Sequence, residues 1–213
     1  MPTLAEQGVS GYELVGFIVG IADRANVLTG ARVTDGDILL GLPSAGLHTN
    51  GYSLARRVLF DQLGLRLQDR LPGVSSKLLV GEWLLAPHLS YLAPLSPLLA
   101  APGLHALAHI TGGGLTDNLP RVLPDGLGAE IRLGSWEIPE PYRLLQEKGD
   151  IELEEMFRVF NMGIGMVACV AADAATEISR RLAAAGQRAL PIGRVVAGAK
   201  GVVYDLGLTA FEE

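Results

Sequence analysis

The sequence predicts an α+β (mixed α/β) fold. Short apolar runs rich in β-branched residues recur along the chain, as in strands. Segments with apolar residues three or four apart lie between several of them, as in helices that cover a core. The two kinds of segment do not alternate strictly, and strict alternation would instead indicate a parallel α/β sheet.

Composition supports a folded domain and argues against several classes of partner. The chain has 213 residues, of which 49% are hydrophobic and 19% charged, so it is able to bury a substantial core. The net charge of −6 and the scattered arginines argue against nucleic-acid binding. No apolar run approaches the roughly 20 residues that span a bilayer, and the N-terminus does not resemble a signal peptide. The single cysteine, Cys169, is expected to be a buried and inert core residue in a reducing cytoplasm.

The expected elements follow the apolar pattern in chain order. Residues 15–21 and 38–42 are apolar and β-branched, which predicts two strands. A helix is expected from Tyr52 or Ser53, and residues 78–99 are read as a helix interrupted by prolines. Further strands are expected at residues 106–110, 129–133, 166–171, 190–196 and 202–205. Further helices are expected at residues 115–123, 141–148, 152–157 and after Asp173, which is expected to cap the last of them.

The first loop with chemical character lies at residues 44–51, between a strand and a helix. Its small residues allow backbone N–H groups to approach an anion, while His48 and Asn50 offer directed hydrogen bonds. The alternative is a tight turn in which Asn50 and Gly51 make the bend and Ser53 caps the helix. Composition alone does not separate these two readings.

The second and third loops are also rich in glycine. Three successive glycines at 112–114 follow His109 and Thr111, and such a run favours close approach of a ligand to the backbone. His109 is a ligand contact, a neighbour of a metal or, as is more common for a lone histidine, a structural residue at a strand end. Residues 160–166 contain Asn161 and two glycines, and their alternative reading is a bulged entry to a strand.

Other polar clusters are assigned to structure or solvent. The acidic residues Asp150, Glu152, Glu154 and Glu155 are read as a solvated helix face rather than a metal site. His88 and His105 have no partner pattern and are read as structural. No P-loop, dinucleotide fingerprint or nucleophile elbow is present in the sequence.

Three segments together resemble the aminoimidazole ribonucleotide synthetase (phosphoribosylformylglycinamidine cyclo-ligase) family. Residues 36–54 resemble its S-G-x-H-[ST]-N-G-[YF]-S segment, and residues 105–120 resemble its H-x-x-A-H-[IL]-T-G-G-G segment. Residues 156–166 resemble its third segment, and the similarity extends from about Tyr12 to the C-terminus. The resemblance implies the C-terminal domain of that fold, a mixed sheet with helices packed on it.

The resemblance also implies roles for individual residues. Substrate contacts are implied for Ser44, Gly46, His48, Asn50, Gly51 and Asn161, and phosphate contacts for Thr111, Gly112, Gly113 and Gly114. His48 and His109 are the candidates for catalysis, and no metal ligand is identified. The family often has A-P-T-R-x-Y where this chain has A-P-H-L-S-Y at residues 86–91, so an arginine is missing at Leu89.

The implied reaction closes an imidazole ring with ATP. Phosphorylation turns the formyl amide oxygen of formylglycinamidine ribonucleotide into a leaving group, and the amidine nitrogen attacks within the same molecule. ATP and Mg²⁺ are expected to be held mostly by an N-terminal domain that also forms a homodimer. Residues 1–34 resemble only the end of that domain and a linker, and residues 35–213 resemble the C-terminal domain. The chain alone is therefore expected to be inactive and to self-associate through residues 15–21.

Two alternatives remain open from the sequence. One is another ATP-dependent enzyme of the same superfamily, such as a selenophosphate synthetase, a thiamin-phosphate kinase, a hydrogenase-maturation protein or the larger formylglycinamide amidotransferase. The other is a module without catalytic activity that binds the ribonucleotide or acts in assembly.

Overall fold

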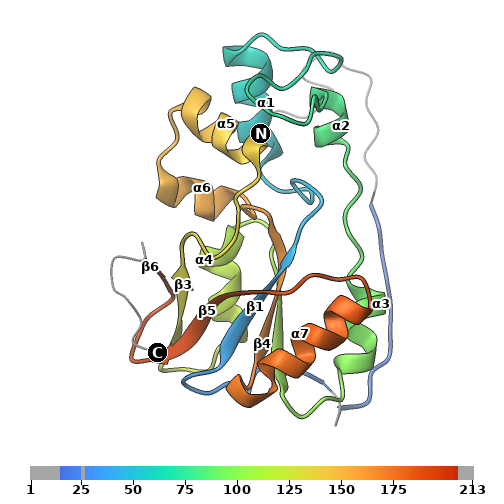
Figure 1. Cartoon of the computed structure of the whole chain (residues 1–213), viewed down its shortest axis with the longest axis vertical. Helices are drawn as coiled ribbons and strands as arrows, with labels where there is room; N and C mark the ends of the chain where they lie inside the picture. The colour runs from blue at the N-terminus through green and yellow to red at the C-terminus, as the bar shows by residue number, and fades with distance from the viewer. Residues whose placement is uncertain (1–14, 25–26, 206–213) are drawn as a thin grey trace.

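A computed structural model describes residues 15–24 and 27–205 of the chain. Its centre is a six-stranded sheet with strand order β2-β4-β1-β5-β3-β6 (Figure 1). The strands are β1 (Ile38–Pro43), β2 (Leu104–His109), β3 (Leu127–Arg132), β4 (Ile164–Val170), β5 (Leu190–Ala197) and β6 (Val202–Asp205). Neighbours are antiparallel except β3 and β6, which are parallel. The expected mixed sheet is therefore confirmed.

No two strands that are consecutive in sequence are neighbours in this sheet. The first strand, β1, lies between β4 and β5 and pairs with both over most of its length. Both edges of β1 are thus occupied by strands from the last third of the chain. The loop that follows β1 is held near the start of β4 as a result, because Pro43 pairs with Ile164.

The helices gather on the faces and at one end of the sheet. They are α1 (Tyr52–Arg56), α2 (Val80–Leu84), α3 (Leu92–Leu95), α4 (Gly114–Asn118), α5 (Glu140–Gly149), α6 (Leu153–Val159) and α7 (Ala175–Ala184). Figure 1 shows α1, α2, α5 and α6 together beyond one end of the sheet, and α3 and α7 beside β1 and β4. A π-helical segment, η2 (Arg57–Gln62), continues α1, and 3₁₀ segments follow α3 and α4.

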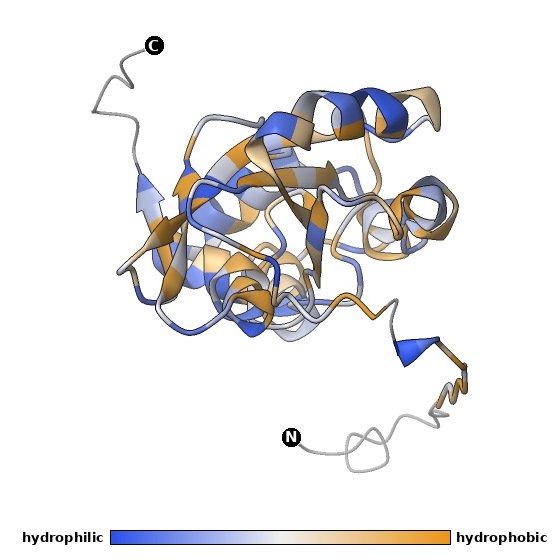
Figure 2. Cartoon of the chain, turned by 90° about the horizontal axis from the view of Figure 1, so that it is seen from below, coloured by the Kyte–Doolittle hydropathy of each residue, from blue (hydrophilic) through white to orange (hydrophobic). Residues whose placement is uncertain are grey.

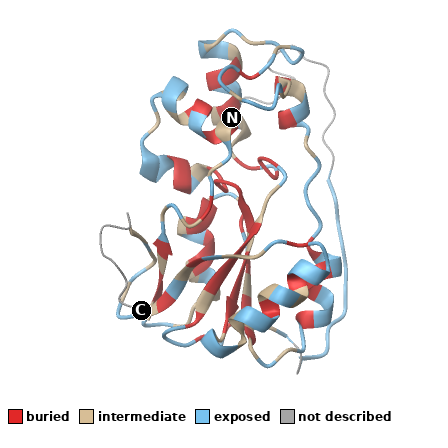
Figure 3. Cartoon of the chain, viewed as in Figure 1, coloured by how far each residue is buried: buried red, intermediate tan, exposed pale blue. Residues whose placement is uncertain are grey.

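The central strands bury both of their faces (Figure 3). On β1, Leu39 belongs to the larger core, which also contains residues of α4, α5 and α6. Leu40 and Leu42 point to the other face, where they pack with Ile178 and Leu182 of α7. Successive side chains of a strand point to opposite faces, so a fully apolar strand requires a cover on each side. This explains why the run at β1 reads as continuously hydrophobic.

The strand expected at residues 15–21 is wrong. These residues form no strand in the structure, and the side chains of Val15, Phe17 and Ile18 are 90%, 90% and 94% exposed. Figure 2 shows this apolar stretch extending away from the body of the molecule. A strand requires hydrogen bonds from a neighbour, and no described strand pairs with this stretch. The stretch is apolar, as the sequence shows, but no described strand lies beside it to supply the hydrogen bonds that a strand requires.

Two smaller expectations also need correction. Residues 78–99 do not form one interrupted helix but two short ones, α2 and α3, separated by a segment without helix around Pro87. Asp173 does not cap α7, because a 3₁₀ turn (Ala172–Ala174) precedes that helix and its N-cap residue is Ala174. The remaining expected elements are present, with boundaries shifted by a few residues. Cys169 is buried, and burial raises the pKa of its thiol to about 12, as expected for an inert core residue.

Candidate ligand-binding site

The loop after β1 has an unusual backbone. His48 and Thr49 have φ values of 48° and 63°, and Gly51 follows with 71°. A residue other than glycine whose backbone adopts the left-handed conformation destabilises the fold by about 1 kcal/mol or more, and here two such residues follow each other. Such strain persists only where surrounding contacts enforce it. The contacts of Asn161 and His48 supply that enforcement.

Asn161 fastens this loop to the third glycine-rich segment. Its side-chain nitrogen donates to Gly46 O (2.8 Å), and its side-chain oxygen accepts from Ser44 Oγ (3.1 Å) and Gly163 N–H (2.8 Å). The Tyr142 hydroxyl lies 2.7 Å from the same oxygen and 2.8 Å from Gly46 O. Asn161 is fully buried, so its amide is used within the protein. Sequence reasoning missed Tyr142, whose role depends on a contact with a residue far away in the chain.

His48 is buried and neutral. Its Nε2 accepts hydrogen bonds from the N–H groups of Ala45 (3.0 Å) and Leu89 (3.3 Å), so the ring proton resides on Nδ1. Among the residues that the structure describes, none forms a hydrogen bond with Nδ1, which faces Gly165, where an added Cβ would lie 2.7 Å from it. Burial, and then the nearby His88 and His109, lower the pKa of His48 to about 4. This ring is therefore a fixed acceptor for loop N–H groups at neutral pH.

Three histidine rings lie in contact from the buried His48 to the exposed His88 and His109, and the first two of them are stacked. The ring of His88 lies parallel to His48, with centroids 3.9 Å apart and an interplanar angle of 22°. His109, at the end of β2, meets the ring of His88 edge to face, with its Nε2 3.2 Å from Nε2 of His88. Burial and then His88 lower the pKa of His109. Sequence reasoning left His88 as structural, because no motif places it beside the other two.

Asn50 connects the first loop to the second. Its side-chain nitrogen donates to His48 O (2.9 Å) and more weakly to Ile110 O (3.4 Å). Within the described part of the chain, no donor reaches its side-chain oxygen. That oxygen faces the second loop, since a Cβ added at Gly112 would lie 3.9 Å from it. Asn50 therefore offers a free acceptor where two loops meet.

The Thr111–Gly114 loop is held by another asparagine that sequence reasoning missed. The buried Asn118 donates from its side-chain nitrogen to the carbonyl oxygens of Thr111 (3.2 Å), Gly112 (3.3 Å) and Gly114 (2.8 Å). It also accepts from Thr111 Oγ1 (3.1 Å). Because these carbonyls turn toward Asn118, the N–H groups of Gly112 and Gly113 remain without an acceptor among the described residues. Free N–H groups in a turn are a recurrent means of binding an anion.

Two glycines of this loop are required for reasons of space. A Cβ on Gly114 would lie 1.9 Å from Phe157 O, so this residue lets the loop pack directly on α6. Gly113 has φ 100°, and a Cβ there would meet the side chain of Asp117 at 2.6 Å. Asp117 places a carboxylate beside the free N–H groups. An anion bound at this loop would therefore experience local repulsion.

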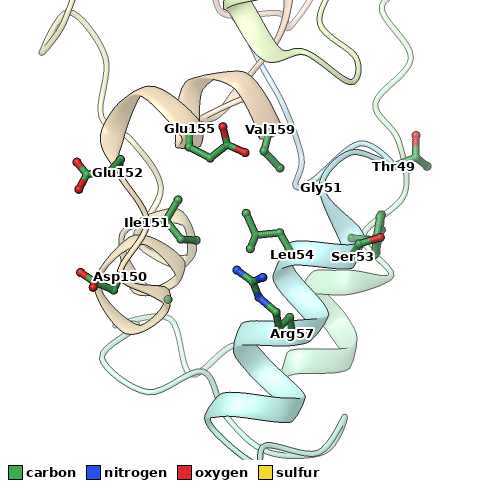
Figure 4. A pocket seen from close by; sticks show the side chains of 12 residues that line it. Thr49, Gly51, Ser53, Leu54, Arg57, Asp150, Ile151, Glu152, Glu155 and Val159 are labelled. Carbon is green, nitrogen blue, oxygen red and sulfur yellow. The ribbon is translucent and has the colours of Figure 1, made fainter. Parts of the chain in front are cut away.

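A pocket lies beside the first loop, with Thr49 and Gly51 among the residues that line it (Figure 4). It has a volume of about 870 Å³ and lies between α1 and η2 on one wall and α5 and α6 on the other. In Figure 4, Arg57 and Leu54 project into it from one wall and Glu155 and Ile151 from the opposite wall. Of the residues expected to bind substrate, only Gly51 lines this pocket.

The structure thus brings the three expected loops together but distributes their residues over different surfaces. Ser44 and Gly46 line a pocket of about 290 Å³ near Tyr142, and His109 lines another of the same volume with His88. The acidic residues 150, 152, 154 and 155 are exposed, as expected for a solvated face. No helix in the described part of the chain is long and apolar enough to cross a membrane.

Comparison with known proteins identifies the family of this chain. The family model described as "AIR synthase related protein, C-terminal domain" matches residues 34–205. A curated phosphoribosylformylglycinamidine cyclo-ligase from Bacillus cereus is 49% identical over 196 residues. That match covers 92% of this chain and 56% of the relative, so the chain spans little more than half the length of the curated protein.

Solved structures show the same fold. A thiamine-monophosphate kinase from Stenotrophomonas maltophilia superposes with a TM-score of 0.60 at 19% identity, covering 86% of this chain and 54% of that one. HypE from E. coli, a hydrogenase maturation protein, superposes with a TM-score of 0.53 at 28% identity, covering 82% of this chain and 48% of that one. With its family model matching most of its length, this chain belongs to the AIR synthase related family and carries that family's C-terminal domain.

Proposed function

We propose that this chain is the substrate-side domain of a phosphoribosylformylglycinamidine cyclo-ligase, which closes the imidazole ring of aminoimidazole ribonucleotide in purine biosynthesis. The name of the 49% identical relative supports this activity. In the proposal, residues 35–213 form the C-terminal domain, and residues 1–34 correspond to the end of an N-terminal domain and a linker. ATP, Mg²⁺ and the homodimer contacts belong mainly to the part of the relatives that this chain does not span. The proposed location is the cytoplasm.

The observation that carries the proposal is the meeting of the first two loops. There the free side-chain oxygen of Asn50 faces Gly112, next to the N–H groups of Gly112 and Gly113. An acceptor beside two donors suits a ribonucleotide, which presents N–H groups on its amidine and oxygens on its phosphate. The buried amides of Asn161 and Asn118 fix the two loops in this geometry.

Each expected residue then receives a proposed task. Asn50 would accept a hydrogen bond from the substrate. Gly112 and Gly113 would hold a phosphate through their free N–H groups, and Thr111 and Gly114, whose backbone groups bond to each other, would shape the loop around it. Ser44, Gly46 and Asn161 would position the first loop, since their polar groups bond to one another. His48 would orient loop N–H groups rather than transfer a proton, because its Nε2 already accepts two hydrogen bonds. His109, at the surface, is the better candidate for direct contact with substrate.

The geometry also fits a need for a cation. The carboxylate of Asp117 borders the loop proposed to hold a phosphate. Mg²⁺ bound with ATP would supply positive charge that offsets this repulsion and the charge of the phosphoryl group in transfer. Enforced proximity of the activated amide carbon and the amidine nitrogen would then favour ring closure. The task of this domain in the reaction would be to hold the ribonucleotide in that folded conformation.

The test separates binding from turnover. The chain is titrated with formylglycinamidine ribonucleotide by calorimetry and thermal shift, and a coupled assay follows ATP hydrolysis and imidazole formation. We expect binding without turnover, and about a tenfold or greater loss of affinity in Asn50→Ala, which removes a hydrogen bond to a charged or strongly polar group. Gln187→Ala removes another nearly buried amide outside the three loops and should bind as the unaltered chain does.

The other outcomes decide against the proposal or part of it. Absence of binding, or equal binding by Asn50→Ala, would contradict the assignment of the substrate site. Turnover by the chain alone would show that the ATP site lies within these residues. Binding in this chain and no turnover in any longer form of the protein would instead support a module without catalytic activity.

A further inference from the structure

One ring nitrogen of His88 and one of His109 lie within hydrogen-bonding distance of each other. Their Nε2 atoms are 3.2 Å apart, the ring centroids are 5.2 Å apart, and the ring planes meet at 67°. Both residues are exposed, so the space beside the two nitrogens is open to solvent. Two neutral imidazoles in this arrangement share one hydrogen bond in the absence of another partner.

The tautomer of His88 is fixed by its backbone. Its Nδ1 lies 2.9 Å from Leu89 O, and a carbonyl oxygen only accepts, so Nδ1 carries the proton. Nε2 of His88 therefore carries a lone pair that accepts the hydrogen bond from His109, and a metal ion would replace this hydrogen bond. A histidine whose second nitrogen donates to a backbone carbonyl is typical of metal ligands, because this contact fixes the ring and raises the basicity of the other nitrogen.

The ring of His88 is also held in its plane. It stacks on the buried ring of His48, which is itself fixed by the N–H groups of Ala45 and Leu89. His48 is not available as a third ligand, because its Nε2 accepts these hydrogen bonds and its Nδ1 faces Gly165. It acts as a rigid support. The pair of outer nitrogens is thus placed before any ion arrives.

We propose that His88 and His109 bind a divalent transition-metal ion such as Zn²⁺ or Ni²⁺ through their Nε2 atoms. With metal–nitrogen bonds of about 2.0–2.1 Å, two nitrogens at this separation subtend about 100° at the ion, close to tetrahedral geometry. His109 would move its proton from Nε2 to Nδ1, so binding requires no net loss of a proton. Imidazole suits Zn²⁺, Ni²⁺ and Cu²⁺, whereas Mg²⁺ prefers oxygen ligands, so this site is distinct from one that accompanies ATP.

The two imidazoles would be the whole protein contribution to the site. Among the described residues, no group of three or more histidine, cysteine, aspartate or glutamate side chains is placed to hold a metal. Water or a ligand would occupy the remaining positions. Those positions adjoin an apolar pocket of about 290 Å³ lined also by Tyr91, Leu95 and Met166. The site would therefore accept an additional donor from a bound molecule.

The test is a titration of the tag-free chain with Zn²⁺ and, in parallel, Ni²⁺, each followed by calorimetry. We expect one ion per chain, and a loss of affinity of at least about tenfold in both His88→Asn and His109→Asn. His105→Asn is the matched control, because His105 pairs with Asp37 (2.6 Å) and takes no part in the stack. Thermal unfolding verifies that all three variants remain folded.

A second measurement does not depend on variants. Nitrogen NMR of the imidazole rings should show Zn²⁺ shifting Nε2 of His88 and His109 and moving the His109 proton to Nδ1, with excess Mg²⁺ producing no such change. Equal binding by His88→Asn and the unaltered chain would overturn the proposal. Loss of binding in His105→Asn alone, or unchanged ring signals at saturating Zn²⁺, would overturn it as well.

Discussion

The buried neutral His48 should make the chain sensitive to mild acid. Its ring is 2% exposed, and its Nε2 is already occupied by two N–H donors, so a proton added there would break both hydrogen bonds. Burial first, then the neighbouring His88 and His109, lower its pKa from 6.5 to about 4. In the unfolded chain the same ring takes up a proton near its ordinary pKa. Acid therefore favours the unfolded state.

The size of the effect follows from linkage. The full shift of about 2.5 pKa units corresponds to about 3 kcal/mol of unfolding free energy, present above pH 6.5 and lost as the pH falls toward 4. Between pH 7 and pH 5 the loss from this residue alone is about 2 kcal/mol. That is a large share of the 5–15 kcal/mol by which native domains are typically stable.

Urea unfolding at pH 7 and pH 5 measures this loss, and His48→Gln isolates it. Glutamine keeps an acceptor oxygen for the Ala45 N–H but has no group that titrates in this range. We expect the variant to be less stable at pH 7 and to lose about 2 kcal/mol less than the unaltered chain on going to pH 5. Parallel losses in the two proteins would refute a neutral, buried His48, since the other titrating groups are common to both.

Three further predictions concern packing and the exposed stretch. Asn118→Ala should lower the free energy of unfolding in urea by about 1–3 kcal/mol, because the loop carbonyls lose their hydrogen-bond donor. It should also weaken the binding of inorganic phosphate, and an unchanged phosphate affinity would contradict the assignment of this loop. Gly165→Ala should unfold at a lower temperature, since its Cβ would lie 2.2 Å from the Tyr91 hydroxyl and 2.7 Å from Nδ1 of His48; an unchanged melting temperature would contradict these close contacts. The double variant Phe17→Ser/Ile18→Ser should reduce self-association in light scattering, because both side chains are at least 90% exposed; a monodisperse monomer for the unaltered chain would exclude association through this stretch.

Most of the sheet was predictable because its strands bury both faces. The runs at β1 and β4 are continuously apolar, as in a strand or helix that is buried on all sides. The glycines that flank these runs favour a strand over a helix. The same reasoning failed at residues 15–21, where an equally apolar run has no strand beside it. The hydrophobic pattern of a segment indicates whether it is able to form a strand. Whether the strand forms also depends on a second strand that pairs with it, and the pattern of the first segment does not identify that partner.

The site was predictable only in outline. The three loops were recognisable by their glycines and by their resemblance to a family, and the structure brings them together. The residues that fix them were not recognisable, because Asn118 acts within its own turn through backbone carbonyls and Tyr142 reaches Asn161 across the fold. His88 was missed for a related reason: its partners, His48 and His109, come from two other segments of the chain.

The strand order has a consequence for how this chain folds as it leaves the ribosome. Since none of the six described strands pairs with its neighbour in sequence, this part of the sheet has no hairpin from which to grow, and β1 must wait for β4 and β5. The entropy lost on closing such long loops must be overcome before the strands make contact, and this slows folding, as in other topologies of high contact order. During synthesis the apolar β1 would remain unpaired with both of its edges open, which is a hazard for aggregation. Chaperone dependence of expression should therefore fall in a circular permutant that begins after α6 and places β4 and β5 ahead of β1.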